Sequence, residues 1–399
     1  MSEVAERLEE LRESGLHRRL RLVESPQGPR VLLDGNPVLL LCSNDYLGLA
    51  DRAEVRDAAA QAALRWGAGA GASRLISGNM EPHRRLEERL AAFKGYEAAL
   101  LFGSGYLANL GAISALAGRG GVVFSDELNH ASIVDGCRLA RAETFVYRHG
   151  DAEHLAWGLR EAVGRASLIV SDGVFSMDGD VAPLGDLVRL AREHGCKLMV
   201  DEAHATGALG PGGRGSVAAA GLSDEVDLVV GTLGKALGSY GAYVCASAEL
   251  REYLLNTARS FVFSTALPPP SLAAATAALQ LLEEGPGMVA RLNANAAVLR
   301  EGLRAEGLAP GGERSQIVPL EIGEARPTMA LCERLLERGV FAQGIRPPTV
   351  PVGSSRLRFS MMATHEEADL REAARLTGEA ARELGLTAPR PTASLPVAA

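Results

Sequence analysis

Between about Ala53 and Glu284 the chain alternates short β-rich apolar runs with helical stretches. The runs are AALLF, GVVFS, TFVYR, SLIVSD, KLMVD, VDLVV and GAYVCA, and patterns such as GYLANLGAISALAG and LGDLVRLAREHG lie between them. Strands that alternate with helices usually pair in parallel and are covered on both faces. The pattern therefore predicts a large α/β domain over residues 51–284, built on a mostly parallel sheet.

The flanking segments have different patterns. Residues 1–50 predict an N-terminal arm, with a helix over 3–14 and two short strands punctuated by Pro and Gly. Residues 285–387 predict a smaller α+β domain, with a long helix, a strand at 316–322, a helix at 328–338 and a strand at 355–361. Thr364 and Glu367 have capping-box spacing, which predicts the start of the last helix. Residues 388–399 are rich in Pro and Ala and predict a disordered tail.

Composition and charge indicate a soluble protein of the cytoplasm. The chain has 399 residues, of which 47% are hydrophobic and 23% charged, and its net charge is −8 with no block of like charge. Nucleic acid and anionic membranes are therefore poor partners. Five scattered cysteines without a CxxC pair argue against a disulfide framework or a cysteine zinc site, and we expect no metal. We identify neither a signal peptide nor a membrane span.

The stretch GTLGKALG places Lys235 among small residues just after an apolar run. A phosphate-binding P-loop would need glycine at position 229 and Ser or Thr after the lysine, but Val229 and Ala236 occupy these positions. A solvated surface lysine is the commonest alternative. However, three glycines in the stretch allow backbone to approach closely, and no other charge is nearby. A lysine in a small dry pocket can form a Schiff base with an aldehyde cofactor.

Pyridoxal phosphate (PLP) is such a cofactor, and its chemistry needs an acid that keeps the pyridine nitrogen protonated. The stretch KLMVDEAHATG supplies Asp201 directly after a predicted strand, and His204 follows where the chain turns. The ordinary role of an Asp at this position is to cap a helix. The imidazole of His204 has the chemistry to hydrogen-bond the phenolic oxygen of the ring.

PLP also needs a phosphate cradle and a flat side chain against the ring. FGSGYLANLGA opens a predicted helix at Gly105 and Tyr106, where free N–H groups attract phosphate, and Thr232 adds a hydroxyl. An ordinary strand-to-helix turn has the same pattern. His130 follows the run GVVFS and is a candidate for the ring face, although a capping or partly buried histidine is the common case.

Three of these candidates share one position in the predicted sheet. Ser176, Asp201 and Lys235 each come just after a strand, and the carboxyl ends of parallel strands lie at one edge. The sequence therefore predicts a single site at that edge.

Several motifs then resemble those of the α-oxoamine synthases, which are PLP enzymes of the aspartate-aminotransferase fold type (fold type I). They are GAGASRLISGN, NHASIVDG, GVFSMDGD, VDEAHATG, GTLGKALGSYGAYV, FVFSTALPP and IRPPTVPVGSSRLR. The resemblance runs from SNDYLGLA to RLRFSMM and so covers nearly the whole chain.

The resemblance implies a role for each matching position. It makes Lys235 the Schiff-base lysine and the proton carrier, and it pairs Asp201 with the pyridine nitrogen. It pairs His204 with the ring oxygen and stacks His130 on the ring. The residues that it implies around the cofactor and its phosphate are Gly105, Tyr106, Ser176 and Thr232, with Ser264 and Thr265 serving the neighbouring subunit of a homodimer with shared active sites.

Substrate contacts are implied in the same way. Arg358 is implied as the clamp for the amino-acid carboxylate, because a guanidinium matches a carboxylate as a planar fork. Thr349 is implied near the substrate, together with an arginine of the arm, for which we prefer Arg18 and keep Arg19 as the alternative.

Within the family, IRPPTVP together with FSTALPP resembles the biotin-pathway member. That resemblance implies a decarboxylative condensation of L-alanine with a pimeloyl thioester, carried by coenzyme A or by a carrier protein. Glycine with acetyl-CoA, or a broad range of acyl-CoA substrates, remains the alternative. A pseudoenzyme subunit is disfavoured because the lysine and the acid are both present. A dinucleotide-binding oxidoreductase is disfavoured because no GxGxxG opens a helix after a strand.

Overall fold

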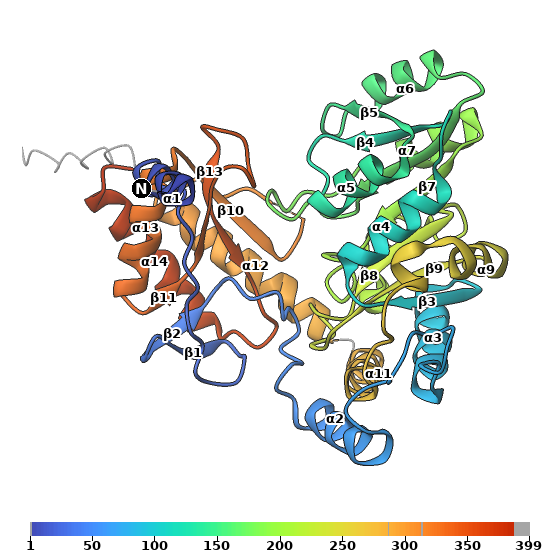
Figure 1. Cartoon of the computed structure of the whole chain (residues 1–399). Helices are drawn as coiled ribbons and strands as arrows, with labels where there is room; N and C mark the ends of the chain where they lie inside the picture. Colours follow the sequence, from blue (N-terminus) through green and yellow to red (C-terminus); the bar gives the residue numbers. More distant parts are fainter. Residues whose placement is uncertain (1, 286, 313, 387–399) are drawn as a thin grey trace, which may run out of the picture.

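The computed structural model describes residues 2–285, 287–312 and 314–386, so the tail predicted at 388–399 lies outside the described residues. Figure 1 shows a sheet-bearing body on the right and, on the left, a smaller body made from the N-terminal arm and the C-terminal third of the chain. The boundaries of the predicted domains stay a prediction.

The sheet-bearing body is built on seven strands, each at or within two residues of a run predicted from the sequence. The strands are β3 (Ala98–Phe102), β4 (Val122–Asp126), β5 (Glu143–Tyr147), β6 (Ala166–Asp172), β7 (Lys197–Asp201), β8 (Leu228–Thr232) and β9 (Ala242–Ala246). Their order is β5-β4-β6-β7-β8-β9-β3, and β9 alone runs antiparallel to its neighbours. The mostly parallel sheet is therefore confirmed.

Helices cover both faces of the sheet, which is why its strands are apolar nearly throughout. On one face Val170 and Val230 join a core with α4 (Gly105–Leu116) and α5 (Ala131–Ala140). On the other, Val200 and Val229 join a core with α3 (Glu81–Lys94), α6 (Ala152–Glu161) and α7 (Leu184–His194). Below the sheet in Figure 1, α2 (Ala53–Trp66) packs against α11 (Pro269–Glu284). The remaining elements of this body are η1 (Pro211–Gly213), α8 (Ser216–Ala219), α9 (Ala248–Thr257) and α10 (Arg259–Val262).

The smaller body holds a three-stranded antiparallel sheet in the order β10-β13-β12. Its elements are α12 (Gly287–Ala305), β10 (Ile317–Gly323), α13 (Ala325–Glu337), β12 (Gln343–Ile345), β13 (Ser355–Ser360) and α14 (Glu367–Glu383). The arm supplies α1 (Glu3–Glu13), β1 (Arg30–Leu33) and β2 (Asn36–Leu40), and β2 pairs in parallel with β11 (Val340–Phe341). The short strands β11 and β12 were not predicted, and β11 is the strand that pairs with the arm.

The predicted capping box at Thr364 and Glu367 is wrong. Helix α14 begins at Glu367 with Glu366 as its N-cap and without a side-chain cap. The residues before it turn inward, because the buried His365 accepts a hydrogen bond from the Met362 amide and bonds the Leu40 carbonyl through its other ring nitrogen. Thr364 lies against Gly48, where an added Cβ would come within 2.6 Å of the Thr364 methyl.

Candidate active site

The carboxyl ends of the parallel strands bring the predicted residues together. Asp172 at the end of β6 is in register with Asp201 at the end of β7, and β8 ends three residues before Lys235. The turn after Lys235 depends on Gly238, which has φ +56° and leaves an added Cβ only 2.5 Å from the Ala50 amide nitrogen. A side chain there would collide with backbone, so glycine is required for this turn.

Lys235 differs from the other two lysines of the chain in its partners. Lys94 pairs with Glu202 at 3.0 Å, and Lys197 pairs with Asp227 at 3.8 Å. Within the described part of the chain, Lys235 has no carboxylate at ion-pair distance, and its Nζ lies 2.9 Å from Nε2 of His204. Burial lowers the pKa of Lys235 to about 8, against the opposing charge of Asp201. A neutral amine is therefore accessible near neutral pH.

His204 is held by a side chain from the arm. Its exposed fraction is 7%, and its Nδ1 lies 2.5 Å from the hydroxyl of Tyr46, which is itself fully buried. Burial lowers the pKa of His204 well below its ordinary value, and the positive charge of Lys235 acts in the same direction. A neutral imidazole has one donor and one acceptor nitrogen, so it bridges Tyr46 and Lys235.

Asp201 lies 4% exposed beside a second carboxyl group. Its Oδ2 accepts from the Asn109 side chain at 2.7 Å, and its Oδ1 accepts from the Ala203 amide at 2.8 Å. Burial and the charge of Asp201 raise the pKa of Asp172 well above its ordinary value. Two close carboxyl groups rarely ionise together in a dry site, so Asp172 is the one that takes the proton.

His130 caps α5 and faces a cleft of about 870 Å³ that Ser176 and Thr349 also line. Its amide donates to Asp172 at 2.8 Å, and its Nδ1 lies 2.7 Å from the Ser132 hydroxyl. Burial lowers the pKa of His130, which favours a neutral ring. The predicted His130 and Ser176 thus line the same cleft.

Arg358 extends from β13 of the smaller body to the loop that carries Ser176. Its Nε donates to the carbonyl of Ser176, and its Nη1 donates to the Ser360 hydroxyl at 2.9 Å. The residue is 6% exposed, and its described hydrogen-bond partners, which are Ser176, Ser360 and the side chain of Asn44, are all uncharged. A buried guanidinium without an anionic partner can accept a substrate carboxylate.

The two arm arginines have different neighbours. Arg18 donates to the Pro347 carbonyl at 3.4 Å and lines a second cleft of about 690 Å³ with Thr349. Arg19 lines the same cleft, but its guanidinium pairs with Glu333 at 3.3 Å. The preference for Arg18 over Arg19 stays a prediction, and these contacts favour it.

The candidate phosphate ligands lie at two places. Helix α4 begins at Gly105, and its N-cap Ser104 accepts from the Leu107 amide at 3.3 Å, so the helix N-terminus is formed as predicted. The hydroxyl of Tyr106 bonds Asp135. Thr232 accepts from the Gly234 amide at 3.1 Å in the turn that leads to Lys235.

Ser264 and Thr265 lie apart from Lys235 in this chain. They line a small pocket with Arg74, His83 and Gly103, beside the end of β3. Their predicted role toward a neighbouring subunit stays a prediction.

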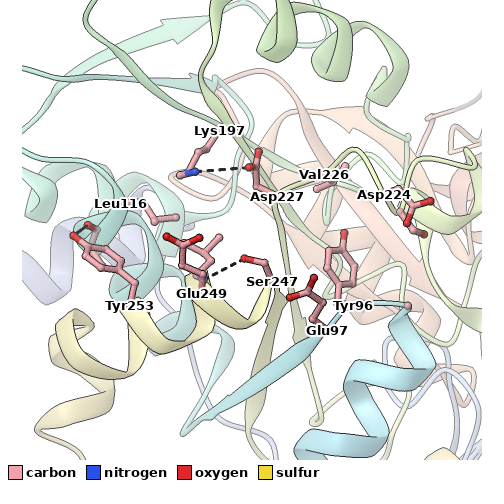
Figure 2. A pocket seen from close by; sticks show the side chains of 14 residues that line it. Tyr96, Glu97, Leu116, Lys197, Asp224, Val226, Asp227, Ser247, Glu249 and Tyr253 are labelled. Carbon is pink, nitrogen blue, oxygen red and sulfur yellow. Dashed lines mark hydrogen bonds and ion pairs between the residues drawn. The ribbon is translucent and has the colours of Figure 1, made fainter.

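A further cleft of about 630 Å³ lies at the opposite, amino edge of the sheet (Figure 2). Lys197 and Asp227 form an ion pair in its lining, and Glu97 and Glu249 line it as well. None of the predicted site residues lines this cleft, so the two edges of the sheet are chemically distinct.

The carboxyl-edge residues fit PLP. Lys235 offers an amine with a lowered pKa, and each oxygen of Asp201 accepts one described hydrogen bond, which leaves a lone pair for a ring N–H. The Oδ1 of Asn109 is buried without a partner among the described residues. The N-terminus of α4 supplies N–H groups for a phosphate. Among the described residues no group of three or more His, Cys, Asp or Glu side chains is arranged to hold a metal.

The fold and the site define a class of protein, and comparison with known families agrees. Residues 36–376 match the family model of aminotransferase class I and II, so the chain is a PLP-dependent enzyme of fold type I. The chain belongs to the 8-amino-7-oxononanoate synthases. It is 56% identical over 386 residues to the 8-amino-7-oxononanoate synthase of Geobacter sulfurreducens, covering 96% of this chain and 99% of the relative. The synthase of Citrifermentans bemidjiense is 55% identical over 389 residues, with 97% and 100% covered.

Solved structures agree with this assignment. Serine palmitoyltransferase from S. paucimobilis, with a bound PLP–myriocin aldimine, has a TM-score of 0.92 and 34% identity, covering 96% of this chain and 98% of that one. The 8-amino-7-oxononanoate synthase of Francisella tularensis has a TM-score of 0.76 and 29% identity, with 87% and 98% covered. No described helix is long and apolar enough to cross a membrane.

Sequence reasoning missed Tyr46, Asn109 and Asp172. Tyr46 lies 158 residues from His204, and no local pattern links them. Asn109 gave a signal, because it is a polar residue in an otherwise small and apolar helical stretch one turn after Gly105. Asp172 ends an apolar run in the same manner as Asp201, so the sequence contained the signal needed to recognise it.

Proposed function

We propose that this site condenses L-alanine with a pimeloyl thioester and releases 8-amino-7-oxononanoate, CO2 and the free thiol, as a step of biotin biosynthesis. The proposal rests mainly on the surroundings of Lys235. Its amine lies beside His204 and has no carboxylate partner in the described part of the chain. Membership of the 8-amino-7-oxononanoate synthases supports the choice of reaction.

PLP, when bound, supplies an electron sink for a carbanion at the amino-acid α-carbon. Asp201 would hold the pyridine nitrogen, His204 would bond the ring oxygen and His130 would pack on the ring. The proposed phosphate and ring contacts are Gly105, Tyr106, Ser176 and Thr232, with Ser264 and Thr265 acting on the cofactor of the other subunit in a homodimer.

Lys235 anchors the aldehyde and moves the proton at the α-carbon. This proton transfer needs a neutral amine, and burial lowers the pKa of Lys235 to about 8. The buried Arg358 orients the alanine carboxylate through a guanidinium whose described hydrogen-bond partners are all uncharged. Thr349 and Arg18 are the proposed contacts of the acyl substrate, and this is supported by Thr349 lining both clefts and Arg18 lining one of them.

The assay that tests this function measures product formation with alanine and glycine, each against pimeloyl and acetyl thioesters. We expect alanine with a pimeloyl thioester to give the highest kcat/KM. Glycine with acetyl-CoA as the preferred pair would contradict the proposal and establish the alternative. Pimeloyl-CoA and pimeloyl carrier protein, compared at fixed alanine, identify the acyl donor.

A further inference from the structure

His149 lies between two carboxylates that belong to different loops. It follows β5, and its Nδ1 lies 3.0 Å from Asp126 at the end of β4. Its Nε2 lies 2.9 Å from Asp180, in the loop after β6. The proposed reaction assigns no role to this residue.

The first carboxylate fixes the segment that leads to His130. Asp126 accepts from the Leu128 amide at 2.9 Å and from the Gly150 amide at 2.9 Å. The amide of His149 in turn donates to Glu127 at 2.8 Å. The turn over residues 126–130, which ends at His130, is therefore tied to the residues after β5.

The second carboxylate belongs to the loop that carries Ser176. The carbonyl of Asp180 accepts from the Phe175 amide at 3.0 Å, which closes the loop around Ser176. The Phe175 ring meets the His149 ring edge-on, with 4.4 Å between centroids. From the other side, Arg356 pairs with Asp178 and Arg358 bonds the Ser176 carbonyl. His149 thus contacts this loop from the sheet side.

The bridge depends on the charge of the imidazole. A protonated ring donates from both nitrogens, whereas a neutral ring donates from one only. The hydrogen bonds to Asp126 and Asp180 raise the pKa of His149 to about 10, against the partial burial of the ring. The side chain is 27% exposed, so solvent can exchange the proton. The charged groups that face it are Asp126, Asp180 and Glu127, whose carboxylate bonds the His149 amide.

We infer that His149 is a positioning residue, whose imidazolium ties the segment ending at His130 to the loop carrying Ser176. His130 and Ser176 line the same cleft, so the bridge sets the spacing of two of its walls. This inference rests on the proposed function, because the spacing matters only if the cleft receives substrate.

The test compares the holoenzymes of the wild type, His149→Gln and His149→Arg in kcat/KM for alanine between pH 7 and 11. Because the pKa of His149 is raised to about 10 in the folded protein, the protonated bridge is intact below pH 10. The bridge is lost as pH rises through about 10. The wild type should therefore lose activity near pH 10. The glutamine variant should have about tenfold lower kcat/KM at pH 8 and should lack that fall.

The arginine variant separates charge from shape. A guanidinium keeps its charge over this range, so the variant should retain most of the wild-type rate and lose the fall near pH 10. His194→Gln, on the last turn of α7, is the matched control and should follow the wild type. The visible absorbance of the bound cofactor should stay unchanged in all four proteins.

A glutamine variant with the wild-type rate and the wild-type fall would overturn the inference. If that variant does not fold, the arginine variant decides, because a fall near pH 10 that persists in it contradicts the assignment. The wild-type rate with alanine and a pimeloyl thioester is measured first. If the wild type shows no activity with this substrate pair, the proposed function is contradicted. If the wild type is active and His149→Gln has no effect, only the role of His149 is contradicted.

Discussion

The strands β7 and β8 present a lysine and an aspartate at both edges of the same sheet. At the amino edge, Lys197 begins β7 and pairs with Asp227 just before β8, and the two side chains are 48% and 36% exposed. At the carboxyl edge, Asp201 ends β7 and Lys235 follows β8, with Asp201 buried and Lys235 half-buried. The two edges therefore differ in burial and pairing rather than in residue type.

The difference shows what makes a lysine reactive. An exposed ion pair such as Lys197 with Asp227 contributes about 0–1 kcal/mol and leaves both groups in water (Figure 2). Burial lowers the pKa of Lys235 to about 8, and its amine bonds a neutral histidine instead of a carboxylate. Desolvation of a charge that has no direct counter-ion is the physical mark of a functional site.

Replacing Lys235 should have the largest effect on turnover of all the substitutions at the two edges. We expect Lys235→Ala to lower turnover by at least about a thousandfold, because both the covalent anchor and the proton carrier are lost. The absorbance change that alanine causes in the holoenzyme should also disappear. Lys197→Ala is the matched control and should keep both properties. Unchanged turnover in the Lys235→Ala variant would contradict the assignment.

Asp201→Asn should have the next largest effect. Loss of the negative charge beside the pyridine nitrogen weakens the electron sink, and we expect kcat to fall about a hundredfold. Asp227→Asn at the amino edge should leave kcat unchanged. Steady-state kinetics with saturating PLP measures both, and equal losses in the two variants would show that the edges are not distinct.

In the cofactor-free protein, the pH dependence of stability tests whether folding desolvates the amine of Lys235. The pKa of Lys235 falls from 10.5 to about 8 on folding, so the unfolded chain binds more protons between these pH values. The contribution of Lys235 to stability is therefore unfavourable below pH 8 and is relieved as pH rises toward 10.5.

Lys235→Met should accordingly stabilise the protein more at pH 7.5 than at pH 10, by about 2 kcal/mol in urea unfolding. Lys197→Met should show no such difference. A Lys235→Met effect that is the same at both pH values would mean that the amine is not desolvated.

Tyr46→Phe should have the smallest effect of the series. It removes the hydroxyl that lies 2.5 Å from His204, and we expect about a tenfold loss of kcat/KM because the imidazole loses a partner that orients it. Tyr253→Phe is the control, because its hydroxyl bonds a backbone carbonyl at the amino-edge cleft. Equal kinetics of the Tyr46 variant and the wild type would show that the Tyr46 hydroxyl does not orient His204 for catalysis.

The sequence predicted the sheet and the shared edge of Ser176, Asp201 and Lys235 because these depend on local periodicity. Each apolar run of residues 98–246 became a strand, and polar residues just after parallel strands meet at one edge. Family resemblance, rather than spacing, supplied the roles of Arg358, Thr349 and Arg18.

Contacts between distant segments could not be predicted. The bonds of Tyr46 to His204 and of His149 to Asp180 join residues whose neighbours along the chain give no common pattern. The two-residue strand β11 is too short for a period to be recognised. The capping box failed because His365 is drawn into the core, a tertiary effect that local spacing does not contain.

The most direct test reduces the PLP-loaded protein with borohydride and maps the labelled lysine by peptide mass spectrometry. The chain has only three lysines, Lys94, Lys197 and Lys235, so the assignment is unambiguous. The account predicts a pyridoxyl group on Lys235 alone. A label on Lys94 or Lys197, or on none of the three, would contradict it.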